Sequence, residues 1–361
     1  MRKRWDIFCK VIDNYGDIGV CWRLAKQFHE EYAIDVRLWV DDLDVASKIV
    51  TGLDALLYNQ KVNGVEICLW HDDVSFSNVM PADVVIEAFA CELPEPYIQN
   101  MVASKPIWLN LEYLSAETWV DDFHGQGSIH PTTGLRKTFF FPGFTNKTGG
   151  LIREQNLIVR RDAAKAEFTR LPSLQVSLFC YPHAPIHSLL QAMADGEHSV
   201  ECFVPTGGDL GKIADFFERT EIQVGDTLNK KQLSLTVLPF LIQDEYDQLL
   251  WCCDLNFVRG EDSWIRALWS GNPFIWQTYP QEDKHHLKKL AAFLEKYEVK
   301  KNDVLSEFHH AWLENEITPM LWSNLMTALP SLKQHAVLQT EKFESQADLA
   351  SKLVIFTKNK V

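Results

Sequence analysis

The sequence lacks a long hydrophobic run. No segment approaches the ~18–20 uninterrupted apolar residues that a membrane-spanning helix needs. The N-terminal residues MRKRWD are not followed by the apolar core of a signal peptide. The eight cysteines form no C-x-x-C pair, which is typical of reduced and mostly buried thiols. We therefore expect a cytoplasmic protein with no membrane partner.

Basic residues are fewer than acidic ones. Lys and Arg number 35 against 49 Asp and Glu, which gives a net charge of -14. A surface this acidic repels phosphate backbones, so we expect no nucleic-acid partner. Hydrophobic residues make up 46% and charged residues 23% of the chain, which is typical of a folded globular protein. A length of 361 residues suffices for about two domains.

The glycine motifs of common nucleotide-binding enzymes are also missing. There is no P-loop and no G-x-S-x-G nucleophile motif. Residues 13–19 follow the first predicted strand, where a dinucleotide-binding protein has G-x-G-x-x-G, but only Gly16 and Gly19 are present. Pyrophosphate needs that tight glycine turn to approach the backbone, so a nicotinamide or flavin dinucleotide is excluded.

Histidines are present at one helical spacing that suits a metal. His183 and His187 are four residues apart, but Pro185 lies between them and no third ligand is evident. His285-His286 and His309-His310 are adjacent pairs, whose rings diverge on a helix. We therefore expect neither a metal nor a cofactor.

Strand-like and helical segments alternate along two stretches of the chain. The first begins with an apolar strand at residues 5–12 and an amphipathic helix at 18–31; the second covers residues 174–297. This alternation predicts parallel sheets built from right-handed βαβ units. Residues 115–150 are rich in loop-forming residues and aromatics, and after residue 303 the pattern is helical. We predict an α/β protein with two Rossmann-like domains joined near residue 150.

The loop after the first strand carries two aspartates. Parallel sheets bind ligands at the carboxyl ends of their strands, so the loops there are candidate sites. Asp17 alone suits a helix cap, and Asp13 alone suits an acceptor of turn amides. For each residue taken alone, the structural and the functional interpretation are about equally supported. Their joint position at a strand end favours a carboxylate pair placed for chemistry.

Two loops of the second half suit a diphosphate. Residues 259–263 lead from a strand into a helix that stops at Gly271. Asp262 or Ser263 is a suitable N-cap, but the free N–H groups and positive dipole of this helix start also suit an anion. Residues 277–283 supply acceptors, amides and an aromatic ring, and a solvated rim is the alternative interpretation.

Aromatic residues close two strands of the second half. Phe179 and Tyr181 end one strand, while Phe240 ends another and is followed by Gln243. Aromatic rings with one amide are a common way to hold a planar base. Aromatic residues at strand ends are equally often part of the core, so both interpretations stay open.

These loops together resemble the bacterial EarP family, the protein-arginine rhamnosyltransferases that modify translation elongation factor P. The segments that carry the resemblance are DNYGDIGVCWRLAKQ, NLEYLSAE, FFFPGFT, SLFCYP and FVRGEDSWIRALWSGNPFIWQTYPQED. The resemblance implies an inverting glycosyltransferase of GT-B architecture, with two facing Rossmann-like domains and an interdomain cleft. Residues 1–152 would form the acceptor-side domain and 153–340 the nucleotide-sugar-binding domain, with a C-terminal helix at about 341–361 packing back on the first.

The resemblance also implies the substrates and the site. The donor would be dTDP-β-L-rhamnose, and the acceptor partner would be an arginine of elongation factor P. Asp17 would be the general base, Asp13 its partner carboxylate and Glu261 a further essential acid. The residues implied for the nucleotide-sugar are Asn14, Tyr15, Gly16, Phe179, Tyr181, Phe240, Gln243, Asp262, Ser263, Tyr279, Gln281 and Glu282. A GT-B enzyme with another nucleotide-sugar or a small acceptor, and a binding module without activity, remain the alternatives.

An arginine acceptor constrains the chemistry. Its guanidinium has a pKa of about 12.5–13.8, so removing a proton at neutral pH costs roughly 8 kcal/mol. A neighbouring carboxylate favours the charged form and does not remove this proton in advance. We therefore hypothesise that Asp13 and Asp17 first bind the cation by charge-assisted hydrogen bonds. Proton transfer to Asp17 would then accompany attack on the anomeric carbon.

Overall fold

The computed structural model describes residues 3–12, 15–71, 75–169, 172–301, 303–314 and 316–360, without the side chain of Glu282. These residues form two compact units. The first runs from the N-terminus to Gln155 and includes the chain from Gln346 onward, and the second is Asn156–Ser345. None of the described helices combines the length and the apolar character that crossing a bilayer requires.

The first unit contains, in the described part of the chain, a sheet of eight strands. Its order is β3-β4-β2-β1-β5-β6-β8-β7, with parallel pairing from β4 to β8 and antiparallel edge strands β3 and β7. The strands are β1 (Arg4–Cys9), β2 (Asp35–Val40), β3 (Asn59–Val62), β4 (Val65–Leu69), β5 (Val84–Ala88), β6 (Ile107–Leu111), β7 (Gly127–Ile129) and β8 (Arg136–Phe140). The chain order reverses between β1 and β5, and ligands bind beside such a switch point in open α/β sheets.

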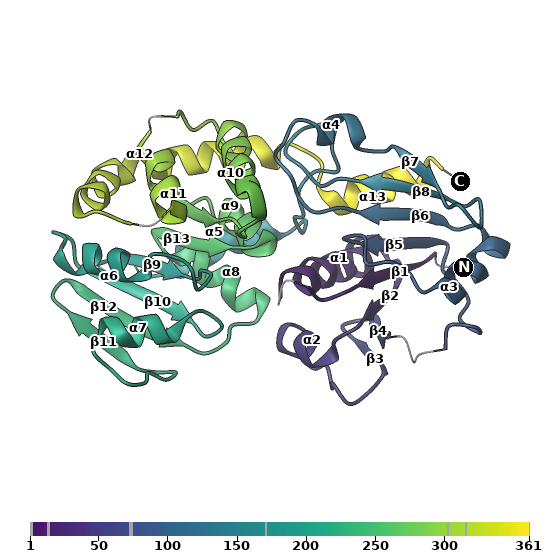
Figure 1. Ribbon diagram of the computed structural model, residues 1–361, viewed down its shortest axis with the longest axis horizontal. Coiled ribbons are helices and arrows are strands. Elements are labelled where there is room, and N and C mark those ends of the chain that lie inside the picture. Colours follow the sequence, from purple (N-terminus) through teal and green to yellow (C-terminus); the bar gives the residue numbers. More distant parts are fainter. Residues whose placement is uncertain are drawn as a thin grey trace. The chain divides into compact units, whose positions relative to one another are not determined.

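The helices of the first unit come from both ends of the chain. They are α1 (Gly16–Tyr32), α2 (Leu43–Ile49), α3 (Glu95–Ser104), α4 (Val120–Phe123) and α13 (Leu349–Lys358). The C-terminal helix α13, yellow in Figure 1, packs on α1 and places Phe356 against Phe140 of β8. Gln27 of α1 donates a hydrogen bond to Asp348, the N-cap of α13, at 3.2 Å.

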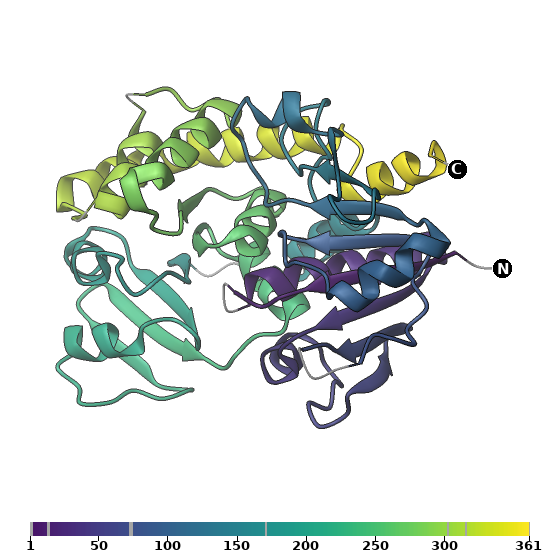
Figure 2. The same cartoon turned by 45° about the vertical axis from the view of Figure 1, so that its right-hand side comes forward.

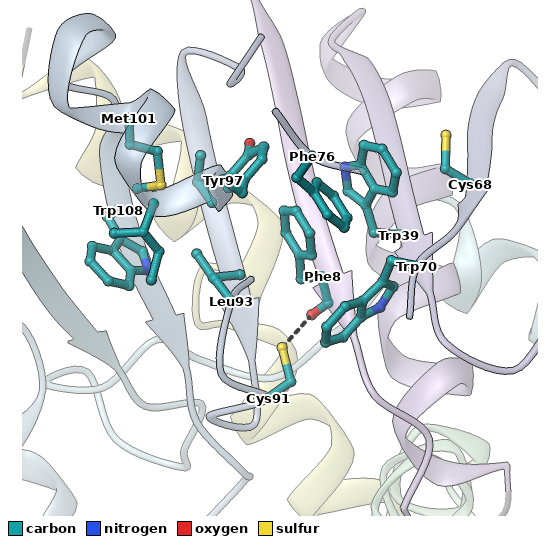
Figure 3. Packing of buried hydrophobic residues seen from close by; sticks show 12 residues of the cluster. Phe8, Trp39, Cys68, Trp70, Phe76, Cys91, Leu93, Tyr97, Met101 and Trp108 are labelled. Atoms are coloured by element: carbon teal, nitrogen blue, oxygen red, sulfur yellow. Dashed lines mark hydrogen bonds between the residues drawn. The ribbon is translucent and has the colours of Figure 1, made fainter. Parts of the chain in front are cut away.

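An aromatic cluster fills the core beneath α3. Phe8 of β1 and Trp39 of β2 are register partners and therefore point to the same face, where their rings stack 5.6 Å apart. Phe76 and Tyr97 pack edge-on or tilted against Phe8, at 6.1 and 4.8 Å (Figure 3). Aromatic pairs of this kind contribute about 0.5–1.5 kcal/mol each beyond the area they bury. The aromatic cluster therefore stabilises the inner strands of this sheet.

The second unit contains, within its described residues, a sheet of six strands in the order β11-β12-β10-β9-β13-β14. The pairing is parallel except at the edge strand β11. The strands are β9 (Leu174–Leu178), β10 (Val200–Pro205), β11 (Thr227–Lys230), β12 (Leu233–Leu238), β13 (Leu255–Arg259) and β14 (Phe274–Gln277). The switch point lies between β9 and β13.

Helices surround this second sheet. They are α5 (Leu157–Glu167), α6 (Ile186–Asp195), α7 (Leu210–Phe216), α8 (Gln243–Cys252), α9 (Glu261–Ser270), the short 3₁₀ helix η1 (Glu282–Lys284), α10 (His285–Lys296), α11 (Val304–Glu314) and α12 (Pro319–Glu344). The long α12, yellow-green in Figure 2, contacts α6, α9 and α11. Asp247 of α8 and Arg266 of α9 form a fully buried ion pair, which ties together two helices that begin at candidate site residues.

The structure corrects three sequence predictions. The first strand ends at Cys9 and not at residue 12. Residues 115–150 are not only loops, because they contain α4, β7 and the parallel strand β8. The edge strands β3 and β11 were not predicted, because each has only four residues and several of their side chains are exposed. Short exposed strands have little hydrophobic periodicity to detect.

Candidate functional site

Asp17 lies in the first turn of α1 and does not cap it. The N-cap is Tyr15, which makes no side-chain cap hydrogen bond. Asp17 is instead turned back toward the preceding loop, where its Oδ2 accepts a hydrogen bond from the Ile12 amide at 2.9 Å. The capping interpretation of Asp17 is therefore wrong. Its side chain is 2% exposed, so the carboxylate is held in one orientation at the carboxyl end of β1.

A second hydrogen bond fixes the other oxygen of Asp17. The Tyr113 hydroxyl donates to Oδ1 at 3.2 Å. Tyr113 follows β6, and its ring stacks on Phe89, which follows β5, with 4.4 Å between ring centroids and 15° between planes. The residues come from the ends of three neighbouring strands, β1, β5 and β6, at the switch point of the first sheet. Asp17 was predicted from the sequence as a site residue, whereas Tyr113 and Phe89 were not.

The rest of the first candidate loop is described only in part. Asp13 and Asn14 lie outside the described residues, so the carboxylate pair stays a prediction. Tyr15 and Gly16 are half-buried at the start of α1. Asp41, which follows β2, accepts a hydrogen bond from the Val11 amide at 2.8 Å, and its burial raises the pKa of that carboxyl group.

In the second unit, the loop between β13 and α9 turns at Gly260. This residue has φ +60° and ψ -171°, a conformation that only glycine adopts readily, and it is the N-cap of α9. The helix therefore begins at Glu261, and the prediction that Asp262 or Ser263 is its N-cap is wrong. Gly271 ends the helix as predicted. Ser263 instead accepts a hydrogen bond from the Arg259 amide at 3.1 Å and donates to the Arg259 carbonyl.

Arg259, the last residue of β13, places a buried cation at this edge. Its guanidinium carbon lies 4.1 Å from the ring centroid of Phe179 and 4.9 Å from that of Tyr181. The guanidinium donates to the carbonyls of Cys180 (3.0 Å) and Gly207 (3.1 Å), and the residue is 9% exposed. Within the described residues, no ion pair joins Arg259 to a carboxylate. A buried charge without a counter-charge is costly, so this position suits an anionic ligand.

A hydrogen-bonded network holds Tyr181 in place. Its amide donates to Gln277 Oε1 at 2.7 Å, and the Gln277 amide nitrogen lies 3.0 Å from His183 Nε2. Burial lowers the pKa of His183, and the nearby Lys212 and His286 act in the same direction, so a neutral ring accepts this bond. The His183 ring stacks on the Tyr181 ring, and the exposed Tyr279 packs edge-on against Tyr181 with 5.4 Å between ring centroids. His183 is therefore tied to Gln277 and is not paired with His187.

The structure thus brings part of the predicted set together. Phe179 and Tyr181 lie against Arg259, which was not predicted from the sequence, and Tyr279 contacts Tyr181. Glu261, Asp262 and Ser263 lie in the first turn of α9. Gln243 is buried at the start of α8, and Phe240 is half-buried after β12. Gln281 is exposed, and the side chain of Glu282 is not among the described parts of the structure. A lone arginine that ends a buried strand was the available signal for Arg259.

Comparisons with known proteins give one family. The family model described as "Elongation-Factor P (EF-P) rhamnosyltransferase EarP" matches residues 5–358. A protein-arginine rhamnosyltransferase of Pseudomonas putida is 43% identical over 378 residues, covering 99% of this chain and 100% of that protein.

Solved structures give the same fold. The structure described as "Structural basis for EarP-mediated arginine glycosylation of translation elongation factor EF-P" aligns with a TM-score of 0.68 and 30% identity over 100% of both chains. The spinosyn forosaminyltransferase SpnP, at 12% identity and a TM-score of 0.55 over 99% of each chain, shares the fold alone. The resemblance and the predicted α/β fold of GT-B glycosyltransferases are confirmed.

Proposed function

The chain belongs to the EarP family of elongation factor P rhamnosyltransferases, and we propose that it transfers L-rhamnose from dTDP-β-L-rhamnose to an arginine of translation elongation factor P. The observation that carries the donor half of this proposal is Arg259, a buried cation without a described counter-ion, held between two aromatic rings at a switch point. We place the reaction in the cytoplasm, where the eight thiols, all free, stay reduced.

The donor would bind through its base and its diphosphate. Phe179 is half-buried and would offer ring surface to a planar thymine, and Tyr181, 5% exposed, would help to hold Arg259 beside it. Gln243, close in sequence to Phe240, would supply a hydrogen-bonding amide. The diphosphate would lie between the Arg259 guanidinium and the N–H groups at the start of α9, where the helix dipole is positive. Both features become more favourable as negative charge develops on the departing dTDP, so they assist the reaction as well as binding.

The acceptor would be held at Asp17. Hydrogen bonds from Ile12 and Tyr113 fix both oxygens of this carboxylate, which orients it for an incoming guanidinium. Together with Asp13, Asp17 would bind the cation before any proton moves. As a guanidinium nitrogen bonds to the anomeric carbon and the bond to dTDP breaks, that nitrogen becomes acidic and its proton passes to Asp17. Attack from the face opposite the leaving group gives inversion.

Glu261 would contribute from the donor side. It is the first residue of α9 and lies two residues after Arg259. A carboxylate at this position can accept hydrogen bonds from sugar hydroxyl groups. We propose this positioning role for Glu261 rather than a second proton transfer.

The test is intact-mass analysis of elongation factor P after incubation with the protein and dTDP-rhamnose. A mass gain of one deoxyhexose on the arginine form of the acceptor is the expected result. Asp17→Asn keeps the size of the side chain but removes the base, and we expect a loss of turnover of at least roughly 100-fold. Asp44→Asn is the matched control, because Asp44 also lies in a first helical turn of the same unit but is exposed.

Two outcomes would contradict the proposal. No mass gain with the unmodified protein would reject the function, and near-normal turnover of a folded Asp17→Asn variant would reject the mechanism. Donor choice is tested separately by competition between dTDP and UDP. Tighter binding of UDP would favour a GT-B enzyme that uses another nucleotide-sugar.

A further inference from the structure

Two stacked aromatic rings lie beside Asp17 in the first unit. Phe89 is 8% exposed and Tyr113 is 38% exposed, so the pair has a buried member and a member that reaches solvent. The hydroxyl of the exposed ring donates the hydrogen bond to Asp17 Oδ1. An aromatic ring that reaches solvent and a carboxylate oxygen are thus neighbours.

The backbone that carries Phe89 adopts an unfavourable conformation. Phe89 and Ala90 have φ values of +56° and +53°, in the left-handed region that residues with a side chain avoid. Hydrogen bonds hold this turn. The Phe89 amide donates to the Leu111 carbonyl at 2.7 Å, the Cys91 amide to the Ala88 carbonyl at 3.2 Å, and the Glu92 amide to the buried Glu87 carboxylate at 3.2 Å. Strain maintained in this way at the end of a strand is typical of functional sites.

We propose that the Phe89–Tyr113 pair selects an arginine acceptor, with Tyr113 positioning Asp17 and the rings receiving the plane of the guanidinium. This inference rests on the proposed function. A guanidinium is planar and weakly hydrated, so it can stack on an aromatic face while its N–H groups bond to a carboxylate. A lysine ammonium is compact and strongly hydrated, and it gains less from a flat ring. The strained turn keeps Phe89 behind Tyr113, which prevents that ring from tilting away from Asp17.

Steady-state kinetics with elongation factor P as the varied substrate distinguishes the positioning of Asp17 by Tyr113 from the binding of the guanidinium by the rings. Tyr113→Phe removes the hydroxyl and keeps the ring, so kcat should fall roughly tenfold while KM stays within about twofold. Phe89→Leu removes the supporting ring and should raise KM roughly three- to tenfold, while Phe89→Trp restores it. Tyr32→Phe is the control, because it removes a hydroxyl bonded to Ser351 at the far end of α1.

Equilibrium binding tests the selection without any transfer of sugar. Calorimetry compares elongation factor P with a variant whose acceptor arginine is replaced by lysine. The unmodified protein should prefer the arginine form, and Tyr113→Leu should reduce that preference roughly three- to tenfold. If no rhamnose is transferred but the preference depends on Tyr113, the proposed function fails and this inference stands.

Several results would overturn the inference. One is a Tyr113→Phe and a Phe89→Leu variant that both keep kcat and KM within twofold of the unmodified protein. A preference for arginine that Tyr113→Leu leaves unchanged would have the same meaning.

Discussion

Replacing Arg259 by methionine should separate the two functions of the donor site. The substitution keeps a long apolar side chain between Phe179 and Tyr181 but removes the charge. It also leaves the carbonyls of Cys180 and Gly207 without this donor, which should lower the free energy of unfolding by about 1–3 kcal/mol.

The larger effect is expected on dTDP. A unit charge about 5 Å from the guanidinium, at an effective dielectric constant of about 20, interacts with it by roughly 3 kcal/mol. Because Arg259 is buried, the effective dielectric constant at this position is well below that of water. Loss of this interaction corresponds to a rise in Kd of about two orders of magnitude. Thymidine carries no phosphate, so its Kd should change by less than about threefold.

Calorimetric titration of dTDP and of thymidine into both proteins gives the four values needed. The change in the Kd of dTDP, compared with the change in the Kd of thymidine, separates the effect of the charge from that of any loss of ring packing. Arg219→Met is the matched control, because Arg219 is exposed in the same unit, and it should leave the Kd of dTDP within twofold. If Arg259→Met weakens dTDP and thymidine equally, the guanidinium is a support for the rings and the reasoning is refuted.

Other predictions concern stability. Asp247→Leu strands the buried charge of Arg266 and should cost about 3–5 kcal/mol in urea unfolding, while adding Arg266→Met recovers most of it; equal losses would contradict this. The buried His309 accepts from the Trp276 amide, and burial lowers its pKa from 6.5 to about 4. The unfolded chain takes up this proton first, so stability falls as pH drops from about 6.5 to 4, by roughly 3 kcal/mol, and His309→Gln should flatten that part of the curve relative to the unmodified protein. Gly260→Ala forces a side chain into a glycine-only conformation and should cost about 1–3 kcal/mol, read as a lower Tm with weaker dTDP binding.

The two parallel sheets were predictable because their inner strands are short apolar segments with long amphipathic helices between them. Such periodicity reflects which face of each element is buried, and it can be read from the sequence without knowing how the strands pair. The strand β8 and the edge strands did not carry this signal. Residues 127–129 are all exposed, and they form a strand only because β8 supplies the pairing partner.

Asp17 shows the limit of local reasoning. An aspartate at a helix start is a common cap, and sequence cannot tell a cap from a side chain that turns back to the loop. The choice depends on the backbone of Tyr15 and on the Ile12 amide, whose position follows from the end of β1. The predicted N-cap of α9 failed for a similar reason, because Gly260 starts that helix earlier.

By itself, the sequence determined the α/β class, the loops at the carboxyl ends of the strands and the family, since these depend on patterns within short segments. Only the tertiary structure decided how the site residues combine. Arg259 meets the Gly207 carbonyl from 52 residues away, and Tyr113 meets Asp17 from 96 residues away. These contacts arise because parallel strands gather their carboxyl ends at one edge, and no local pattern records which side chains then meet.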